Sequence, residues 1–175
     1  MPEAALFSLS DKTGATEIAR ALVRRGVVIY ATGGTKAFLH EHGIEARDVE
    51  DLTGFPPLFD GRVKTLHPKV FGAILYDRSN PAHAEQARVY AIHSVSTLVV
   101  NLYPFEATVA KSGTTLTEAI EQIDVGGVSL LRAAAKNFTD VTILSHPSQY
   151  PAFLNALANG GLDEAARRRL AIAAF

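Results

Sequence analysis

Short apolar runs alternate with helical patterns along the chain, and this alternation constrains the fold more than any other feature. A bounded apolar run of about four to eight residues has the length of a buried strand, whereas apolar residues three and four positions apart mark one face of a helix. Strands that alternate with helices favour a parallel sheet covered on both faces, because each parallel pair needs a crossover connection. We therefore predict a doubly wound α/β domain with a mainly parallel sheet of about five strands.

The pattern divides the 175 residues without any repeat, and this length suits a single domain spanning residues 1–175. The expected strands are residues 4–9, 27–31, 44–49, 71–76, 97–102 and 141–144. The expected helices are residues 13–25, 36–42, 81–92, 115–123, 128–136, 150–158 and 163–175. Residues 52–61, which are rich in Gly, Pro and Phe, are expected to form an ordered loop.

The composition argues against several classes of function. A net charge of −1 does not suit a nucleic-acid-binding surface, which needs clustered excess Lys and Arg. No apolar run approaches the roughly 20 residues of a membrane helix, so we expect no membrane association. Cysteine is absent, and the six His show no ligand spacing, so we expect neither a thiol nucleophile nor a metal site. These observations favour a cytoplasmic protein that binds a small molecule.

Polar groups follow the expected strands at the points where the strands end. Because the carboxyl ends of parallel strands meet at one edge of the sheet, and ligands bind beyond that edge, these groups predict a pocket. A turn with Gly and Thr that opens a helix presents free N–H groups to an anion such as phosphate. Tight turns and ordinary helix N-caps remain the alternative explanation. The groups are Ser10-Asp11-Lys12, Thr32-Gly33-Gly34-Thr35, and Asn101 with Tyr103.

Two further segments carry charged residues that have either a structural or a catalytic explanation. Arg62 and Lys64 flank an apolar residue just after the loop, as in a cationic site or an exposed turn. Asp124 lies shortly before a Gly-Gly pair that precedes an expected helix. The carboxylate is therefore either a helix N-cap or a group beside N–H donors that could hold an oxyanion. Lys136 ends the same helix, where a cation is favourable in any case. The residues alone therefore predict an α/β domain that binds a phosphorylated small molecule.

A series of segments, taken in order, resembles the inosine monophosphate cyclohydrolase domain family, which is elsewhere paired with a formyltransferase. The resemblance implies the methylglyoxal-synthase-like fold. It also implies the substrate 5-formamidoimidazole-4-carboxamide ribotide, with inosine monophosphate and water as products, and no cofactor. The matching segments are residues 5–14, 32–35, 52–56, 61–68, 100–105, 121–127 and 131–137.

The resemblance also implies particular catalytic and binding residues, and we assign roles to the catalytic ones from the chemistry of ring closure. Lys64, Tyr103 and the N–H groups near Gly126 and Gly127 would stabilise the developing oxyanion, and Asp124 would accept the amide proton. Lys136 would orient Asp124 or Tyr103, although a straight helix over 128–136 places it about 12 Å from the start of that helix. The implied catalytic residues are Lys64, Tyr103, Asp124 and Lys136. The implied substrate-binding residues are Ser10, Asp11, Lys12, Thr32, Gly33, Gly34, Thr35, Arg62, Thr65, Asn101, Val125, Gly126 and Gly127.

The chain also departs from that family, and other functions stay open. Phe71 and Ala73 stand where many relatives have His and Gly, and the chain stops at Phe175 where relatives continue with a helical segment. No formyltransferase domain is present in the sequence, so the chain is a stand-alone form or a fragment; a second copy and a formyltransferase are candidate partners. The alternatives are a methylglyoxal synthase-like phosphate lyase, which leaves the Lys64 and Tyr103 segments unexplained, and a non-catalytic module that binds phosphorylated metabolites.

Overall fold

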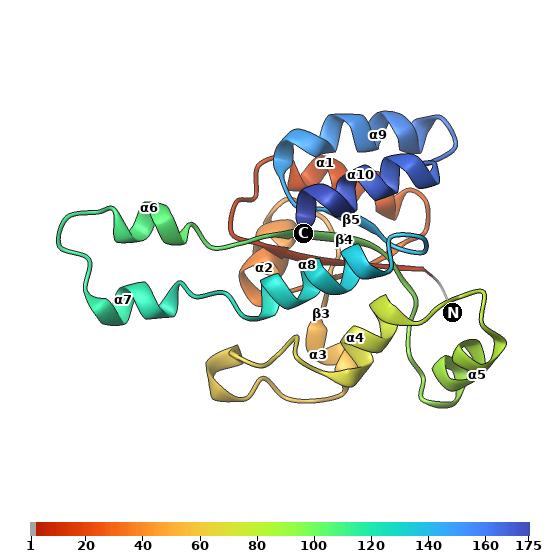
Figure 1. Cartoon of the computed structure of the whole chain (residues 1–175), viewed down its shortest axis with the longest axis horizontal. Coiled ribbons are helices and arrows are strands. Elements are labelled where there is room, and N and C mark those ends of the chain that lie inside the picture. Colours follow the sequence, from red (N-terminus) through yellow and green to blue (C-terminus); the bar gives the residue numbers. More distant parts are fainter. Residues whose placement is uncertain (1–2) are drawn as a thin grey trace.

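A single sheet of five parallel strands forms the centre of the computed structural model, which describes residues 3–175 (Figure 1). The strand order is β3-β2-β1-β4-β5, and every neighbouring pair is parallel. The predicted α/β class, with about five mainly parallel strands, is therefore confirmed. The strands are β1 (Ala4–Leu9), β2 (Val28–Ala31), β3 (Arg47–Asp48), β4 (Val95–Asn101) and β5 (Thr142–Leu144).

The central strand β1 is buried on both faces because its side chains alternate between two apolar layers. Leu6 packs into one cluster of core residues, and Phe7 packs into the other. The chain first runs outward from β1 to β2 and β3, and then returns to place β4 on the other side of β1. This reversal makes the β1–β4 pair the topological switch point, beyond whose carboxyl end ligands bind in open α/β sheets.

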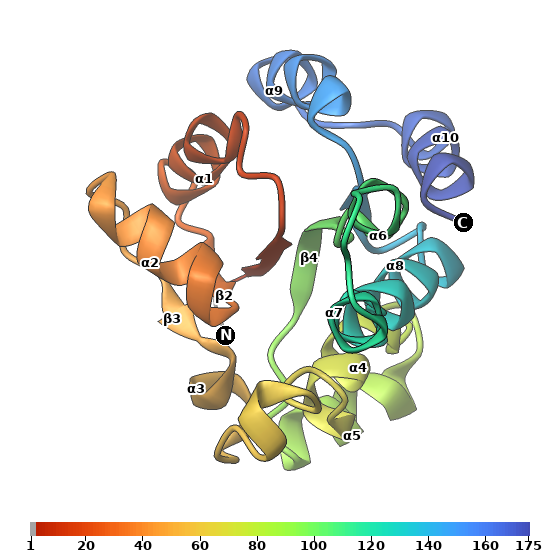
Figure 2. The ribbon, with the colours of Figure 1, turned by 90° about the vertical axis from the view of Figure 1, so that its left-hand side faces the viewer.

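Helices cover both faces of the sheet (Figure 2). One face is covered by α1 (Ala15–Val23), α2 (Gly33–Glu41) and α9 (Tyr150–Ala158). The other face is covered by α3 (Val49–Thr53), α4 (Pro68–Leu75), α8 (Gly126–Lys136) and α10 (Glu164–Ala174). The remaining elements of the body lie in the connections: the 3-10 turns η1 (Phe59–Gly61) and η2 (Pro147–Gln149), and helix α5 (Pro81–Val89).

A two-helix arm projects from the body between β4 and α8 (Figure 1). It contains α6 (Phe105–Val109), which the sequence pattern did not indicate, and α7 (Leu116–Glu121). The expected capping box opens α7: Thr115 accepts a hydrogen bond from the Glu118 N–H, and the Glu118 carboxylate accepts one from the Thr115 N–H. The arm leaves the sheet next to Tyr103 and returns next to Asp124, so both of its ends lie where chemistry was expected.

The predicted strand at residues 71–76 is wrong, because this segment belongs to helix α4. His67 caps the helix by accepting a hydrogen bond from the Lys69 N–H at 3.1 Å, and Pro68 occupies the first turn. Val70, Ala73 and Ile74 are buried at helical spacing. The apolar run therefore reflects one face of a buried helix, which periodicity over a short run does not distinguish from a strand. Ala73, one of the noted departures, lies in this packed face.

Several element boundaries also differ from expectation by one to three residues; α2, for example, begins at Gly33 and β4 at Val95. The strand predicted over residues 44–49 has only two residues, because Asp48 and Asp51 form a capping box that starts α3 at Val49. The helix predicted over residues 128–136 begins two residues earlier, at Gly126.

Substitution of Gly14 tests how closely α1 packs against α9. Gly14 has φ +71°, and a Cβ there would lie 2.9 Å from Cδ2 of Tyr150, a side chain only 3% exposed. Gly26 has φ +78° but open space around its Cα, so Gly26→Ala introduces only the backbone strain. Overpacking costs about 1–3 kcal/mol, so Gly14→Ala should lower Tm by roughly 2–12 °C more than Gly26→Ala does. Thermal unfolding followed by circular dichroism measures the difference. Equal losses of Tm would show that Tyr150 moves aside without cost.

Candidate functional site

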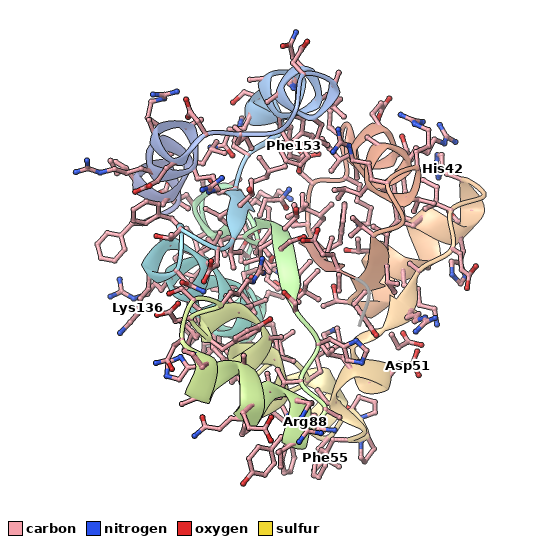
Figure 3. The ribbon with its side chains drawn as sticks, turned by 90° about the vertical axis from the view of Figure 1, so that its right-hand side faces the viewer. His42, Asp51, Phe55, Arg88, Lys136 and Phe153 are labelled. Atoms are coloured by element: carbon pink, nitrogen blue, oxygen red, sulfur yellow. The ribbon has the colours of Figure 1, made fainter. Side chains whose placement is uncertain are left out.

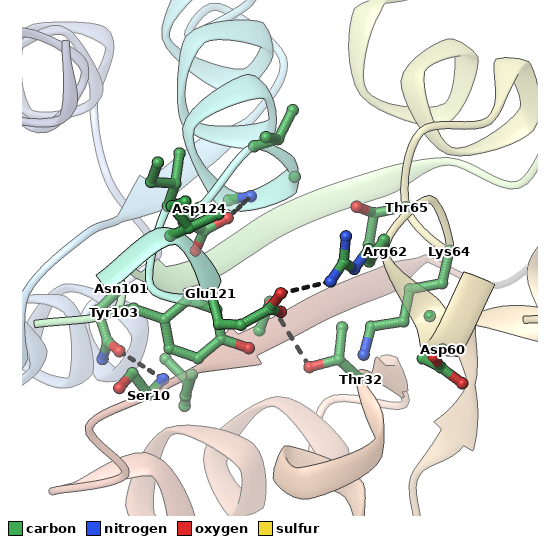
Figure 4. Close-up of a pocket in the computed structure, with 18 residues that line it drawn as sticks. Ser10, Thr32, Asp60, Arg62, Lys64, Thr65, Asn101, Tyr103, Glu121 and Asp124 are labelled. Atoms are coloured by element: carbon green, nitrogen blue, oxygen red, sulfur yellow. Dashed lines mark hydrogen bonds and ion pairs between the residues drawn. The ribbon is translucent and has the colours of Figure 1, made fainter. Parts of the chain in front are cut away.

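A pocket of about 470 Å³ opens at the carboxyl ends of β1 and β4 (Figure 4). Its volume lies in the range of small-molecule sites, and its position is the switch point of the sheet. Three regions that are distant in sequence line it: the ends of the strands, the loop after η1, and the base of the arm with the start of α8. The lining residues are Ser8, Leu9, Ser10, Thr32, Asp60, Gly61, Arg62, Lys64, Thr65, Asn101, Tyr103, Ile120, Glu121, Ile123, Asp124, Val125, Gly126 and Gly127.

The pocket brings together most of the residues expected from the sequence, including three of the four implied catalytic side chains. In Figure 4 the Tyr103 hydroxyl and the Lys64 ammonium point toward the space between them. The expected residues that line the pocket are Ser10, Thr32, Arg62, Lys64, Thr65, Asn101, Tyr103, Asp124, Val125, Gly126 and Gly127. Those that do not line it are Asp11, Lys12, Gly33, Gly34, Thr35 and Lys136.

Asn101 joins the ends of β1 and β4. Its Oδ1 accepts hydrogen bonds from the N–H groups of Ser10 (2.8 Å) and Asp11 (2.9 Å), and its Nδ2 donates to the Asp11 carbonyl oxygen (2.6 Å). The turn after β1 is therefore held in one position beside the pocket. A hydrogen bond from the Thr13 N–H lowers the pKa of the exposed Asp11 carboxyl in this turn.

Thr35 has a structural role in this chain. The side chain is buried, and its Oγ1 accepts a hydrogen bond from the Leu9 N–H at 2.9 Å and donates to the Leu9 carbonyl oxygen at 3.3 Å. This hydroxyl therefore ties α2 to the end of β1. Gly33 and Gly34, in contrast, have open space where a Cβ would stand, so packing within the chain does not require glycine there.

Asp124 both caps α8 and lines the pocket. Its Oδ1 accepts a hydrogen bond from the Gly127 N–H at 2.6 Å, and a Cβ at Gly127 would lie 2.5 Å from its Oδ2. A Cβ at Gly126 would lie 2.6 Å from Oγ1 of Thr65. The Gly-Gly pair is therefore required by close packing, and the Gly127 N–H expected to hold an oxyanion is already bonded to Asp124. The Gly126 N–H has no partner within residues 3–175.

The loop that carries Arg62 and Lys64 has an unusual backbone. Phe59 and Asp60 both have φ +55°, and Gly61 follows with φ +83°. Left-handed conformations cost non-glycine residues about 1–2 kcal/mol each, and such strain is concentrated at functional sites. The Lys64 side chain lies against this turn, because a Cβ on Gly61 would be 3.7 Å from its Nζ.

Glu121 is a site residue that the sequence interpretation missed. Its carboxylate forms an ion pair with the Arg62 guanidinium across the pocket (Figure 4). Glu121 lies in one of the segments that carry the family resemblance, but no spacing rule links it to Arg62 because the two residues are far apart in the chain. Asp60, which also lines the pocket, was missed because it lies in the segment that was expected to form an ordered loop.

Lys136 does not meet the expectation that it orients Asp124 or Tyr103. It is the last residue of α8, whereas Asp124 lies just before the first. The rise of 1.5 Å per residue separates the two ends of this helix by about 15 Å. In Figure 3, which views the molecule from the side away from the arm, the Lys136 side chain points outward. The expected contact of Lys136 with Asp124 or Tyr103 is therefore not formed within a single chain.

Two further features are absent from residues 3–175. No helix there is long and apolar enough to cross a membrane. The described residues also contain no cluster of three or more His, Asp or Glu side chains that could hold a metal ion.

The fold and the pocket together define a class: a parallel α/β domain with a polar small-molecule pocket at its switch point. The chain belongs to the MGS-like domain family, whose model matches residues 14–129. A second model, described as AICARFT/IMPCHase bienzyme, matches residues 134–175.

Known proteins resemble the chain over nearly its full length. The bifunctional purine biosynthesis protein PurH of Staphylococcus aureus, strains Newman and USA300, is 49% identical over 171 residues, which are 98% of this chain. The chain spans only 35% of the length of these relatives. The crystal structure of ForH is 34% identical with a TM-score of 0.84, covering 99% of this chain and 91% of that one.

Removal of the Asn101 side chain tests how the strand ends are held. Each net hydrogen bond contributes about 0.5–1.5 kcal/mol, and part of this network is exposed, so we expect Asn101→Ala to lower the free energy of unfolding by roughly 1–3 kcal/mol. Asn101→Asp keeps the acceptor for both N–H groups but places a carboxylate oxygen against the Asp11 carbonyl oxygen, so it should lose at least as much as Asn101→Ala. Urea unfolding of both variants gives the comparison. An Asp variant as stable as the unmodified chain would contradict this account.

Proposed function

We propose that the chain is an inosine monophosphate cyclohydrolase, which closes 5-formamidoimidazole-4-carboxamide ribotide to inosine monophosphate with loss of water. The observation that carries the proposal is that Lys64, Tyr103 and Asp124, implied as catalytic by the family resemblance, come from three separate segments to line one pocket. The 49% identity to a purine biosynthesis protein and the AICARFT/IMPCHase match also support it.

The reaction sets two requirements on the site. The carboxamide nitrogen attacks the formyl carbon of the same molecule, so a C–N bond forms while the formyl oxygen gains negative charge. The carboxamide nitrogen loses one proton and the formamide nitrogen loses another, the former formyl oxygen gains both, and water leaves as the second ring becomes aromatic. The nucleophile is weak because its lone pair is delocalised, so the site must stabilise the oxyanion and accept the proton.

The side chains around the pocket provide both functions in this proposal. Lys64 and Tyr103 donate to the developing oxyanion, since both reach into the pocket (Figure 4). The unpartnered Gly126 N–H is a third donor, at the positive end of α8. Asp124 accepts the carboxamide proton, and its hydrogen bond to Gly127 holds the carboxylate in one orientation.

The phosphate of the ribotide belongs at the neighbouring turns. Lys12 follows β1, and Gly33 and Gly34 form the uncapped start of α2, where open N–H groups and the helix dipole favour an anion. Their position beside the pocket, not in its lining, suits a group that does not react. A cytoplasmic location, a homodimer and a formyltransferase partner belong to the same proposal and stay predictions.

A spectroscopic ring-closure assay on the chain tests the proposal, and two classes of substitution should fail differently. Lys64→Ala and Asp124→Asn remove interactions with charge that exists only along the reaction path, so kcat should fall by on the order of 10²–10³ with smaller changes in KM. Lys12→Ala removes a contact to an unchanging phosphate, so KM should rise by about 10- to 150-fold with kcat preserved.

The outcomes separate the alternatives. If Lys64→Ala changes only KM, Lys64 is a binding residue and the division of the site is wrong. Tight nucleotide binding without turnover by the unmodified chain would favour a non-catalytic module. Circular dichroism of each variant checks that the fold is retained.

Chelation tests the prediction that the reaction uses no metal. The proposed steps need only hydrogen-bond donors and one carboxylate, and aromatisation drives the loss of water. We expect the ring-closure rate to be unchanged after exhaustive EDTA treatment. Loss of turnover that one added metal restores would overturn this part of the mechanism.

A further inference from the structure

The Arg62–Glu121 ion pair connects two segments that otherwise lie on different sides of the pocket. Arg62 follows the left-handed turn at residues 59–61, and Glu121 is the last residue of α7 at the base of the arm. The Arg62 side chain is 67% exposed and that of Glu121 is 52% exposed. Exposed pairs of this kind contribute only about 0–1 kcal/mol to stability, so folding alone does not explain the pair.

The position of Glu121 is also unfavourable for its own helix. The C-terminal end of a helix carries a partial negative charge, so a cation is preferred in the last turn and a carboxylate is disfavoured. Glu106, in contrast, lies in the first turn of α6, where a carboxylate is favourable. Glu121 is therefore placed for a contact outside α7, and that contact is Arg62.

The geometry of the pair leaves Arg62 able to bind something else. One nitrogen of the guanidinium, Nη2, donates to Oε1 of Glu121, and the side chain makes no second hydrogen bond within residues 3–175. A guanidinium has five N–H donors in a rigid plane, so fixing one nitrogen fixes the direction of the others. The remaining donors belong to a side chain that lines the pocket.

We propose that Glu121 is a positioning residue that fixes the Arg62 guanidinium at the pocket, so that its remaining donors meet an acceptor oxygen of the nucleotide. This inference rests on the proposed function for the identity of the nucleotide. Without Glu121, an exposed arginine on a turn has many rotamers, and binding has to order it. Immobilising one such side chain raises Kd by about two- to tenfold.

The experiment has one arm that needs no ligand. The Nε–H signal of Arg62 in an NMR spectrum, assigned by its loss in Arg62→Ala, reports how mobile the guanidinium is. We expect Glu121→Gln to increase that mobility in the ligand-free chain, and Glu106→Gln to leave it unchanged. Glu106→Gln is the matched control because it removes the same charge from the same arm at a residue that does not line the pocket. Equal mobility of Arg62 in the unmodified chain and in Glu121→Gln would overturn the inference, whatever the protein binds.

The second arm measures binding of inosine monophosphate by titration calorimetry, together with kcat and KM for ring closure. Glu121→Gln should raise Kd and KM by about two- to tenfold and leave kcat unchanged, whereas a merely structural role would lower Tm without this split. On the Arg62→Ala background, Glu121→Gln should have no further effect, because no guanidinium remains to be positioned.

Three other results would each have a different meaning. Tighter binding by Glu121→Gln would mean that the carboxylate competes with the nucleotide for Arg62. An effect that persists in Arg62→Ala would mean that Glu121 contacts the nucleotide itself. Failure of the unmodified chain to bind inosine monophosphate would count against the proposed function, while the mobility measurement still decides the role of Glu121.

Discussion

The parallel pairing of β1 with β4 is the constraint on which the site depends. The two strands stay in register up to Leu9 and Asn101, so they end level with one another at the centre of the sheet. The Asn101 side chain then reaches the backbone of Ser10 and Asp11, and Thr35 fixes α2 to Leu9. A change of one residue in this register would turn every side chain of β1 to the other face and separate these contacts. The position of the polar groups at the edge of the sheet therefore follows from the pairing of its apolar central strands, β1 and β4.

At the start of α8, one carboxylate both bonds to the helix and lines the pocket. Asp124 satisfies the Gly127 N–H as a helix cap does, and it also faces the pocket. The two explanations of this motif that the sequence left open are therefore compatible. A Cβ at Gly127 would meet the Asp124 carboxylate and one at Gly126 would meet Thr65, so the start of the helix and the carboxylate are positioned together. Preorganisation of this kind means that the chain, and not the substrate, orders the acidic group.

Much of the fold and site could be predicted from the sequence, and the failures have physical reasons. Alternating strands and helices indicated the parallel sheet, and polar residues at strand ends indicated the pocket. Residues 71–76 were misassigned because a buried helix and a buried strand can both appear as a short apolar run. The partnership of Arg62 with Glu121 depends on how the arm folds back toward the loop, which no local pattern encodes. Lys136 shows the converse limit: a residue that belongs to a family motif lies at the far end of its helix in this chain.

The arm has a mechanical consequence that follows from where it is attached. Tyr103 lies just before α6, and Asp124 lies just after α7, so both roots of the arm are in the pocket while its tip projects from the body (Figure 1). Each of its helices is much shorter than the roughly 12–15 residues at which an isolated helix is marginally stable in water. Leu116, which is 77% exposed, is an apolar side chain on the outer part of the arm. Because the two ends of the arm carry Tyr103 and Asp124, a displacement of the arm moves the segments of both residues together.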